Sequence, residues 1–551
     1  MGTKTYNNYE SLLTFTRASK GHALRPVSYG SELVTNGDYS DGTTGWTNDS
    51  SLTMDTFEVD SGRLHIENTA GTTQAAYTDD NISLVAGKIY RFTAELEKVS
   101  GNDNWDIDIR AVALSTVRYT MTSTATTETL QVIFVATHTE NTVIQITTRD
   151  TFEGYIDNIS VKEVTFDESD GTLTLFEHPN NVPRVEYDAD GNRLGLLVEE
   201  SRTNLVTYSE DISQYAKVNS PTITTDIATA PDGTETVDGI QDASGGAFRR
   251  AKMFEGSVTA NSTHTGSLFV KKETSETNYG GITLNFTGGT SKVCYGIIDA
   301  VNGTITAPSS GNTITPTFTT TEVGDFWRFS ITATDTGSNT QLEFGVYGTL
   351  STNGTTVGSG AGSVRRIWGA QLEAGSFPTS YIKSNSGSTT TRSADLASIP
   401  VADFGYNQSA GTLLVDYLYQ SLGSGELGRY LELGGSNPSQ DRILLYLSES
   451  SENTALQIRT TAGGTQTGLN VSTPIGQFNK VAGGFSKDDV AAVSNGGSAV
   501  TDTSADIPAN IVELDIGASS SNIADVGVVY IKSIQYYPRR LSNAQLVELT
   551  S

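Results

Sequence analysis

Cysteine is almost absent from this sequence, and its scarcity excludes two ways of stabilising a fold. Cys294 is the only one, so no disulfide can form within the chain and no thiolate zinc site can be built. It lies in an apolar run, residues 293–298, where we interpret it as a small buried hydrophobe. The five histidines are scattered and lack the spacing of a metal site.

Basic residues are also scarce, with 35 Lys and Arg against 63 Asp and Glu and a formal charge of -28. Such a surface repels polyanions, so we expect no nucleic-acid binding. No apolar stretch approaches the roughly 18 residues that cross a bilayer, so we expect no membrane insertion. The N-terminal residues lack the pattern of a secretory signal. We therefore expect synthesis in a cytoplasm and release by another route, such as lysis.

Motifs for catalysis are missing as well. The sequence contains neither a Gly-x-Ser-x-Gly elbow nor a phosphate-binding Gly-Lys-Ser/Thr loop. A glycosidase needs only two carboxylates, so 63 acidic residues leave that chemistry open. We predict no catalytic residue, no enzymatic activity and no required cofactor.

The sequence contains many segments in which apolar and polar residues alternate. Trp327, Phe329 and Ile331 alternate with polar residues, and Leu342, Phe344 and Val346 form a similar set. This alternation is typical of antiparallel strands with one buried face. Apolar residues at helical spacing are confined to the end of the chain, where Ser542 and Gln545 predict a capping box. We expect an all-β protein of tandem antiparallel β-sandwich (jelly-roll) modules with very little helix.

Two segments with similar sequences mark the starts of two predicted domains. Residues 33–38 (LVTNGD) and 205–210 (LVTYSE) each precede a run of alternating strands that closes on an aromatic strand. Between the two runs, two β segments around a Gly-centred turn predict a hairpin. The predicted parts are an N-terminal connector strand (1–30), a first sandwich (31–163), a β connector (164–203), a second sandwich (204–383), a linker (384–392) and a C-terminal domain (393–551).

Several of these segments together resemble a family of bacteriophage and prophage tail-fibre (receptor-binding) proteins. The connector pieces are residues 14–19 (TFTRAS), 182–188 (VPRVEYD) and 194–205 (LGLLVEESRTNL), with module endings at 367–373 (IWGAQLE), 378–382 (PTSYI) and 391–395 (TRSAD). The first sandwich resembles carbohydrate-binding jelly rolls. The last domain resembles concanavalin A-like or laminin G-like lectin domains, through residues 534–542 (IQYYPRRLS). In that family the first two connector pieces lie close in sequence, whereas here a whole module separates them.

The resemblance implies a virion tail protein that acts outside the cell and adheres to host-surface polysaccharide or lipopolysaccharide. It also implies a homotrimer attached to other tail or baseplate proteins. Two alternatives remain: a capsid-decorating fibre or spacer without a ligand of its own, and a polysaccharide depolymerase. Against the depolymerase, the sequence shows no coil repeat of the parallel β-helix that such enzymes usually carry.

Aromatic residues of the first sandwich are the carbohydrate-binding candidates, because a sugar stacks its apolar face on a ring and hydrogen-bonds to amides and carboxylates. We select Trp46, Tyr77 and Trp105, with Asn104 beside Trp105 at a predicted loop end. Packing in the core is the alternative for each ring.

The resemblance to carbohydrate-binding jelly rolls also implies a structural calcium. Asp157 matches a ligand-bearing position, and Asn36 and Asp38 would be its neighbours. Oxygen ligands suit this cation. The alternative is that Asp157 caps a turn.

Overall fold

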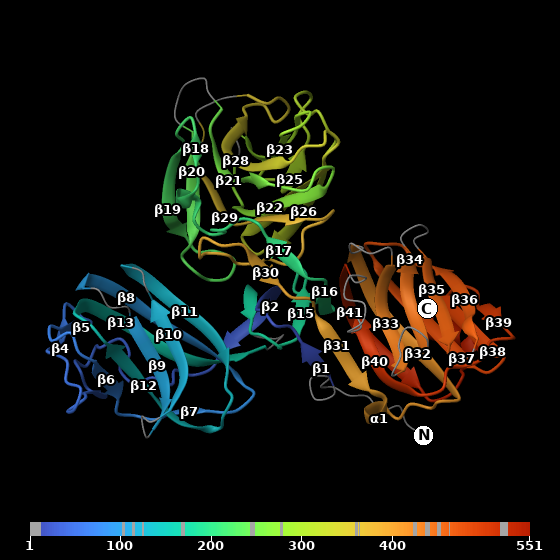
Figure 1. The fold of residues 1–551 in the computed structure, drawn as a ribbon, viewed down its shortest axis with the longest axis horizontal. Helices are drawn as coiled ribbons and strands as arrows, with labels where there is room; N and C mark the ends of the chain where they lie inside the picture. The colour runs from blue at the N-terminus through green and yellow to red at the C-terminus, as the bar shows by residue number, and fades with distance from the viewer. Residues whose placement is uncertain are drawn as a thin grey trace. The chain divides into compact units, whose positions relative to one another are not determined.

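The computed structural model describes residues 13–101, 105–112, 116–123, 126–166, 171–242, 248–275, 279–358, 362, 364–421, 427–435, 441–448, 453–461, 463–517 and 527–551. These residues form antiparallel sheets with very little helix, which confirms the predicted all-β sandwich class (Figure 1). The chain divides into two compact units, one of Pro26–Thr172 and one of Met1–Arg25 with Leu173–Ser551. No helix in the described ranges is long and apolar enough to cross a membrane.

The unit Pro26–Thr172, called here the inserted unit, is a two-sheet sandwich. One sheet has the order β10-β9-β12-β6-β3, with β7 also on β12, and the other contains β11-β8-β13 and the β5-β4 pair. Ile107, Ile109 and Ile144 alternate with polar residues and point into the core between the sheets. The strands are β2 (Gly21–Tyr29), β3 (Trp46–Asn48), β4 (Thr56–Asp60), β5 (Arg63–Asn68), β6 (Gln74–Thr78), β7 (Ile82–Leu84), β8 (Ile89–Gly101), β9 (Trp105–Ala111), β10 (Val117–Ser123), β11 (Thr127–Val135), β12 (Glu140–Thr148) and β13 (Phe152–Thr165).

A second sandwich, called here the middle sandwich, comprises β18 to β29. Its sheets have the orders β18-β21-β28-β23-β24-β25 and β19-β20-β29-β22-β27-β26. Leu342, Phe344 and Val346 fill its core from one sheet, and Phe329 and Ile331 do so from the other. The strands are β18 (Lys217–Val218), β19 (Thr222–Ala228), β20 (Val237–Gln241), β21 (Arg250–Ser257), β22 (Thr263–Lys271), β23 (Tyr279–Thr287), β24 (Lys292–Asp299), β25 (Thr304–Thr306), β26 (Thr317–Val323), β27 (Phe326–Thr334), β28 (Gln341–Ser351) and β29 (Arg365–Ala374), after the 3-10 turn η2 (Ile212–Gln214).

The C-terminal sandwich takes in strands from the connector. Its sheets have the orders β1-β31-β40-β33-β34-β35-β36 and β15-β16-β41-β32-β37-β38-β39. The predicted hairpin is confirmed, because β15 and β16 pair antiparallel, and β16 continues onto β41. The elements are β1 (Thr14–Thr16), β15 (Arg184–Tyr187), β16 (Arg193–Glu199), β31 (Leu396–Pro400), α1 (Val401–Phe404), β32 (Ala410–Ser421), β33 (Leu427–Gly435), β34 (Arg442–Ser448), β35 (Asn453–Thr460), β36 (Gly464–Ser472), β37 (Phe478–Ser486), β38 (Asp489–Ser494), β39 (Val500–Asp502), β40 (Ile511–Gly517), β41 (Val528–Tyr537) and α2 (Asn543–Thr550), with β14 (Thr172–His178), β17 (Arg202–Asn204) and β30 (Thr390–Arg392) outside these two sheets.

The one longer helix ends the chain and begins as the sequence predicts. Ser542 accepts a hydrogen bond from the backbone N–H of Gln545, and the Gln545 side chain reaches back to the backbone of Ser542. This reciprocal pair satisfies two N–H groups that a helix start leaves unpaired.

The connector motifs meet in a buried ionic cluster of Arg17, Arg184, Arg392, Glu199 and Asp395. Arg17 Nη1 lies 3.1 Å from Asp395 Oδ1, and Arg184 Nη2 lies 2.8 Å from Glu199 Oε2. Burial disfavours the charged form of Glu199, but Arg392 and Arg184 outweigh it and lower its pKa to about 2. The motifs therefore have a structural role, because removing one member would leave a buried charge unpaired.

Candidate functional site

The outer face of one sheet in the middle sandwich collects aromatic and polar side chains. Along β28, Leu342, Phe344 and Val346 point into the core, so Glu343 and Tyr347 point to the opposite face. The register places Tyr347 opposite Gly281 on β23, and Glu343 opposite Asn285. Residues far apart in sequence therefore share one surface, called here the middle face.

Three tyrosines define the middle face. Tyr279, Tyr295 and Tyr347 pack with Ile297 and Leu350 in a cluster separate from the main core. The ring centroids of Tyr295 and Tyr347 are 6.4 Å apart at an interplanar angle of 64°. Tyr347 is buried, whereas Tyr279 and Tyr295 are half-exposed. Among the described residues, the hydroxyls of Tyr279 and Tyr295 have no hydrogen-bond partner. These two side chains combine a half-exposed ring with a polar group.

A charged group stands beside the tyrosines. Arg250 forms a two-pronged ion pair with Glu343, with Arg250 Nη2 3.2 Å from Glu343 Oε2. Lys252 Nζ lies 3.3 Å from the same oxygen. The Arg250 stem crosses Gly345, where a Cβ would lie 3.0 Å from Arg250 Cδ. A larger residue at position 345 would displace the guanidinium, so the glycine lets the arginine lie flat against the sheet.

Burial favours the neutral form of two tyrosines of the middle face, Tyr295 and Tyr347. Desolvation raises the pKa of Tyr295, although the nearby Arg250 opposes the shift. Desolvation also raises the pKa of Tyr347. At neutral pH the phenols are therefore hydrogen-bond donors and acceptors. Together with the Asn285 amide, they match a ligand that has apolar C–H faces and many hydroxyls.

The inserted unit has a comparable outer face on β6, β12, β9 and β10, called here the inserted face. Asp106 and Asp108 alternate with the core residues Ile107 and Ile109, yet both carboxylates are buried. Thr120 Oγ1 donates to Asp108 Oδ1 at 2.7 Å. Other members of the network are the pairs Thr122–Asp106, Arg149–Asp106 and Arg110–Gln145. These polar groups are already bonded to one another.

Of the carbohydrate-binding candidates from the sequence, Tyr77 lies on the inserted face. It is half-buried on β6, opposite Gln145 of β12 and Thr47 of β3. Asn104 lies outside the described residues. For Trp105 only the backbone is described, as the first residue of β9.

The structure places Trp46 in the core, with only 4% of its surface exposed. Its indole N–H donates to the Asn36 carbonyl at 3.2 Å, and its ring lies 5.5 Å from that of Tyr39. Core packing, the alternative stated for each candidate ring, is what the structure shows here, because the turn that begins at Asn36 gives the indole N–H an internal partner. The ring therefore has no free face for a sugar.

Two of the candidate calcium residues, Asn36 and Asp38, lie in one turn, and Asp157 lies on β13 where its register with β8 shifts. The Asn36 amide donates to the carbonyls of Gly42 and Thr44 and accepts from Asp41 N, so it holds the turn together. Asp157 Oδ1 accepts from Asn158 N at 2.8 Å. Burial raises the Asp157 pKa, and Glu95 and Asp38 add to the shift. Such repulsion suits a cation, although no group of three His, Cys, Asp or Glu side chains in the described residues is arranged to hold one. Calcium stays a prediction.

The C-terminal sandwich also has acidic residues on an outer face. Glu432 on β33 is opposite Asp515 on β40, and Arg429 Nη1 lies 2.7 Å from Glu432 Oε2. Burial raises the Asp515 pKa to about 7, and the neighbours Glu513 and Glu432 add to this shift. The Asp515 carboxyl group, with its raised pKa, thus lies beside a second carboxyl group, that of Glu432.

Sequence reasoning overlooked the middle face, although its signal was present. Glu343 and Gly345 alternate with the apolar set on β28, and Tyr347 follows it. Tyr295 interrupts the apolar run around Cys294. Alternation predicts that such residues face outward, but pairing between strands decides which of them meet.

Comparisons with known proteins give only distant likenesses. No protein-family model matches the chain, and no curated protein matches it. Among solved structures, the CBM40 of a Ruminococcus gnavus IT-sialidase is 18% identical and covers 27% of this chain and 87% of its own, with a TM-score of 0.23. The tandem CBM22 domains of Paenibacillus barcinonensis Xyn10C are 11% identical, covering 63% and 98%, with a TM-score of 0.21. Domains LG4-5 of the mouse laminin α1 chain are 12% identical, covering 52% and 90%, with a TM-score of 0.17. Likenesses this weak carry no argument, so the candidate faces depend on their own geometry.

Proposed function

We propose that this chain is a non-enzymatic adhesion protein that binds glycans through the outer face of its middle sandwich. The observation that carries the proposal is the middle face. Tyr279 and Tyr295 are half-exposed, and within the described part of the chain their hydroxyls have no hydrogen-bond partner. Tyr295 lies near the Arg250–Glu343 ion pair. Ring faces bind sugar C–H groups, and the phenols, amide and ion pair supply directional partners for hydroxyls.

A glycan array on the full chain tests this proposal. We expect retention on a subset of bacterial surface glycans, and loss of that retention in Tyr295→Ala. Tyr29→Ala is the matched control, because Tyr29 is an exposed ring on β2, a strand that contributes to neither face. Retention that survives Tyr295→Ala would remove the middle face from the proposal. Absence of retention on every glycan would favour a spacer without its own ligand.

The finer proposal is that the protein is a bacteriophage tail fibre acting at the host surface. Its support is the set of connector motifs, whose arginines and acids meet in the buried ionic cluster. We further propose a homotrimer, because three copies would multiply weak sugar contacts through avidity. Mass spectrometry of separated head and tail fractions tests the location, and light scattering tests the trimer. Recovery from heads alone would favour capsid decoration.

A polysaccharide depolymerase is the second candidate, because Glu432 and Asp515 are cross-strand neighbours with raised pKa values. Glycosidases use two nearby carboxylates, one of them protonated. Against this, Glu432 is 1% exposed and already paired with Arg429. We expect no release of reducing ends from host capsule or lipopolysaccharide. Release that Asp515→Asn abolishes would replace adhesion by hydrolysis.

A further inference from the structure

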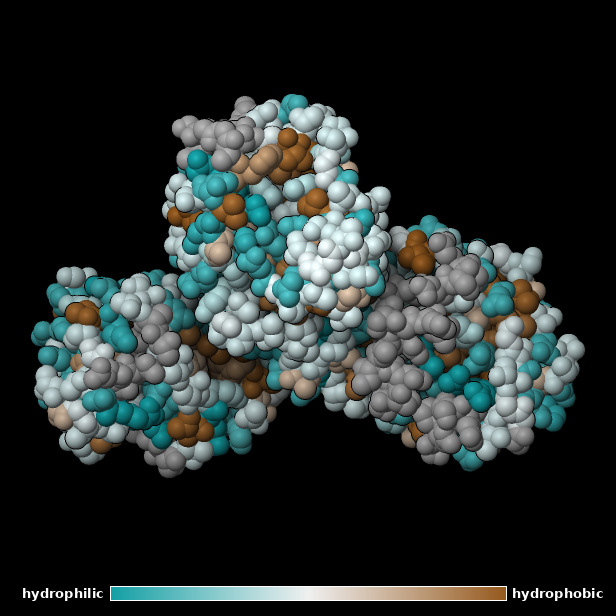
Figure 2. Space-filling model, turned by 45° about the horizontal axis from the view of Figure 1, so that its top comes forward, coloured by the Kyte–Doolittle hydropathy of each residue, from teal (hydrophilic) through white to brown (hydrophobic). Residues whose placement is uncertain are grey.

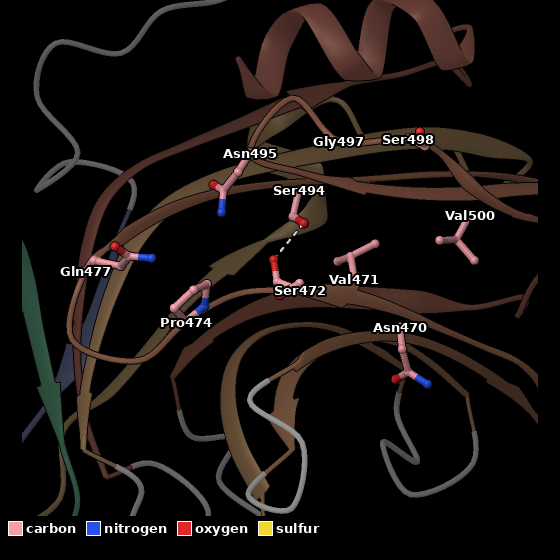
Figure 3. A pocket seen from close by; sticks show the side chains of 10 residues that line it. All are labelled: Asn470, Val471, Ser472, Pro474, Gln477, Ser494, Asn495, Gly497, Ser498 and Val500. Carbon is pink, nitrogen blue, oxygen red and sulfur yellow. Dashed lines mark hydrogen bonds between the residues drawn. The ribbon is translucent and has the colours of Figure 1, made fainter.

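The C-terminal sandwich contains a pocket of about 480 Å³ at the edge where its two sheets approach each other. Its wall comes from the end of β36, the segment before β37, and the turn that follows β38 (Figure 3). The volume falls within the range of small-molecule sites. The pocket is remote in sequence from the middle face and shares no residue with it.

A tight turn fixes the shape of the pocket. Asn495 and Gly496 both have positive φ, and Gly497 N donates to the Ser494 carbonyl at 2.8 Å. The Asn495 side chain is held from two sides, since it accepts from Lys480 N and donates to Asn479 Oδ1, both at 2.9 Å. The turn is therefore ordered before any ligand arrives, which reduces the entropy lost on binding.

Unbonded amides line the same pocket. Within the described part of the chain, the side chains of Asn470 and Gln477 have no hydrogen-bond partner. Figure 3 shows them on either side of Ser472 and Ser494, whose mutual hydrogen bond of 2.8 Å runs from Ser494 Oγ to the Ser472 carbonyl. Each amide offers two donors and an acceptor, which suits vicinal hydroxyl groups.

The remaining wall is apolar and uncharged. Val471, Pro474 and Val500 line the pocket, and Val500 is 39% exposed. No lining residue is ionisable. An anionic ligand would find no cation there, in a chain with a net charge of -28. The pocket combines apolar contact with neutral hydrogen-bonding groups.

We propose that this pocket binds an uncharged, hydroxyl-rich ligand, namely a neutral sugar unit, as a second glycan site separate from the middle face. The proposal rests on the function proposed above in assigning the ligand to glycans. Asn470 and Gln477 bind its hydroxyls, Asn495 and the turn position them, and the exposed Pro474 and Val500 contact its C–H face.

Saturation-transfer NMR on the full chain tests the site with lactose, cellobiose and maltose as neutral probes and glucuronic acid as the charged one. We expect transfer to a neutral probe and none to glucuronic acid. The double variant Asn470→Ala/Gln477→Ala should weaken neutral binding about tenfold, because two hydrogen-bonding side chains are lost. Both side chains lack internal bonds, so the thermal midpoint should not change.

Tyr295→Ala separates this site from the middle face. If neutral binding survives Tyr295→Ala and is lost in the double variant, the pocket is the site. If it is lost in Tyr295→Ala and survives in the double variant, the inference fails while the proposed function stands. Absence of transfer to every neutral probe, or transfer to glucuronic acid that the double variant removes, also overturns the inference.

Discussion

The middle face and the inserted face are built alike and differ in what they leave available. Each is the outer surface of one sheet and carries an arginine beside an acid. On the inserted face, Asp108 and Gln145 are already bonded to neighbours. On the middle face, the phenols of Tyr279 and Tyr295 are unbonded among the described residues. A satisfied network rigidifies a sheet, whereas unbonded groups beside half-exposed rings are free for a ligand.

Figure 2 shows that hydrophobic residues on the displayed surface form only small, scattered patches.

The largest expected difference comes from removing one acid from each face. Glu343→Ala would leave Arg250 and Lys252 without their shared partner, costing about 2–3 kcal/mol of stability and the glycan retention. Asp108→Ala would cost about 1–2 kcal/mol and leave retention unchanged. Denaturant unfolding and the glycan array measure the two effects. Glu343→Gln controls for charge, and equal loss of retention in both alanine variants would contradict the comparison.

Truncating one tyrosine on each face should have a smaller effect. Tyr295→Ala removes an exposed ring and should weaken binding by about 1–2 kcal/mol. Tyr77→Ala should weaken binding by less than about 0.5 kcal/mol, because no other ring packs against Tyr77 among the residues that the structure describes. Titration calorimetry with a glycan identified on the array gives both values. A larger loss in Tyr77→Ala would move the site to the inserted face.

The stability of the middle sandwich and that of the inserted unit should depend differently on pH. Burial raises the pKa of Asp238 to about 7 and that of Asp242 to about 6 in the middle sandwich. The folded state then holds protons that the unfolded state releases, so stability falls as pH rises from about 4 to about 7. In the inserted unit, hydrogen bonds lower the pKa of Asp49 and Asp55, so their contribution changes only below about pH 4.

Hydrogen exchange at pH 5 and pH 8, corrected for intrinsic rates, measures this contrast. From pH 5 to pH 8, we expect the free energy of opening of the middle sandwich to fall by about 1–3 kcal/mol. That of the inserted unit should change little. Asp242→Asn should reduce the dependence of the stability of the middle sandwich on pH. A stronger dependence in the inserted unit than in the middle sandwich would contradict this prediction.

Calcium should give the smallest effect, limited to the inserted unit. If Asp38 and Asp157 share a cation, calcium will relieve their repulsion and raise the thermal midpoint by about 1–3 °C. Asp157→Asn should remove the increase. Calorimetry with calcium or with EDTA makes the measurement, and identical scans would leave Asp157 with only its structural hydrogen bond from Asn158 N.

Much of the local structure could be predicted from alternation and capping. The strand through Leu342, Phe344 and Val346, the hairpin of β15 and β16, and the capping box at Ser542 all form as expected. These features depend on residues close in sequence. Local patterns left open whether Trp46 binds a sugar or packs in the core, because none of them shows that the Asn36 carbonyl lies within reach of its indole.

Sequence by itself determined that this chain forms β-sandwiches without disulfides and with a strongly acidic surface, because composition and period-two patterning are local properties. Tertiary structure alone decided which outward residues meet. Arg250 pairs with Glu343 across 93 residues, and Arg17 pairs with Asp395 across 378. Strand register sets such pairs, and a shift of one residue would turn Tyr347 into the core and Phe344 onto the surface.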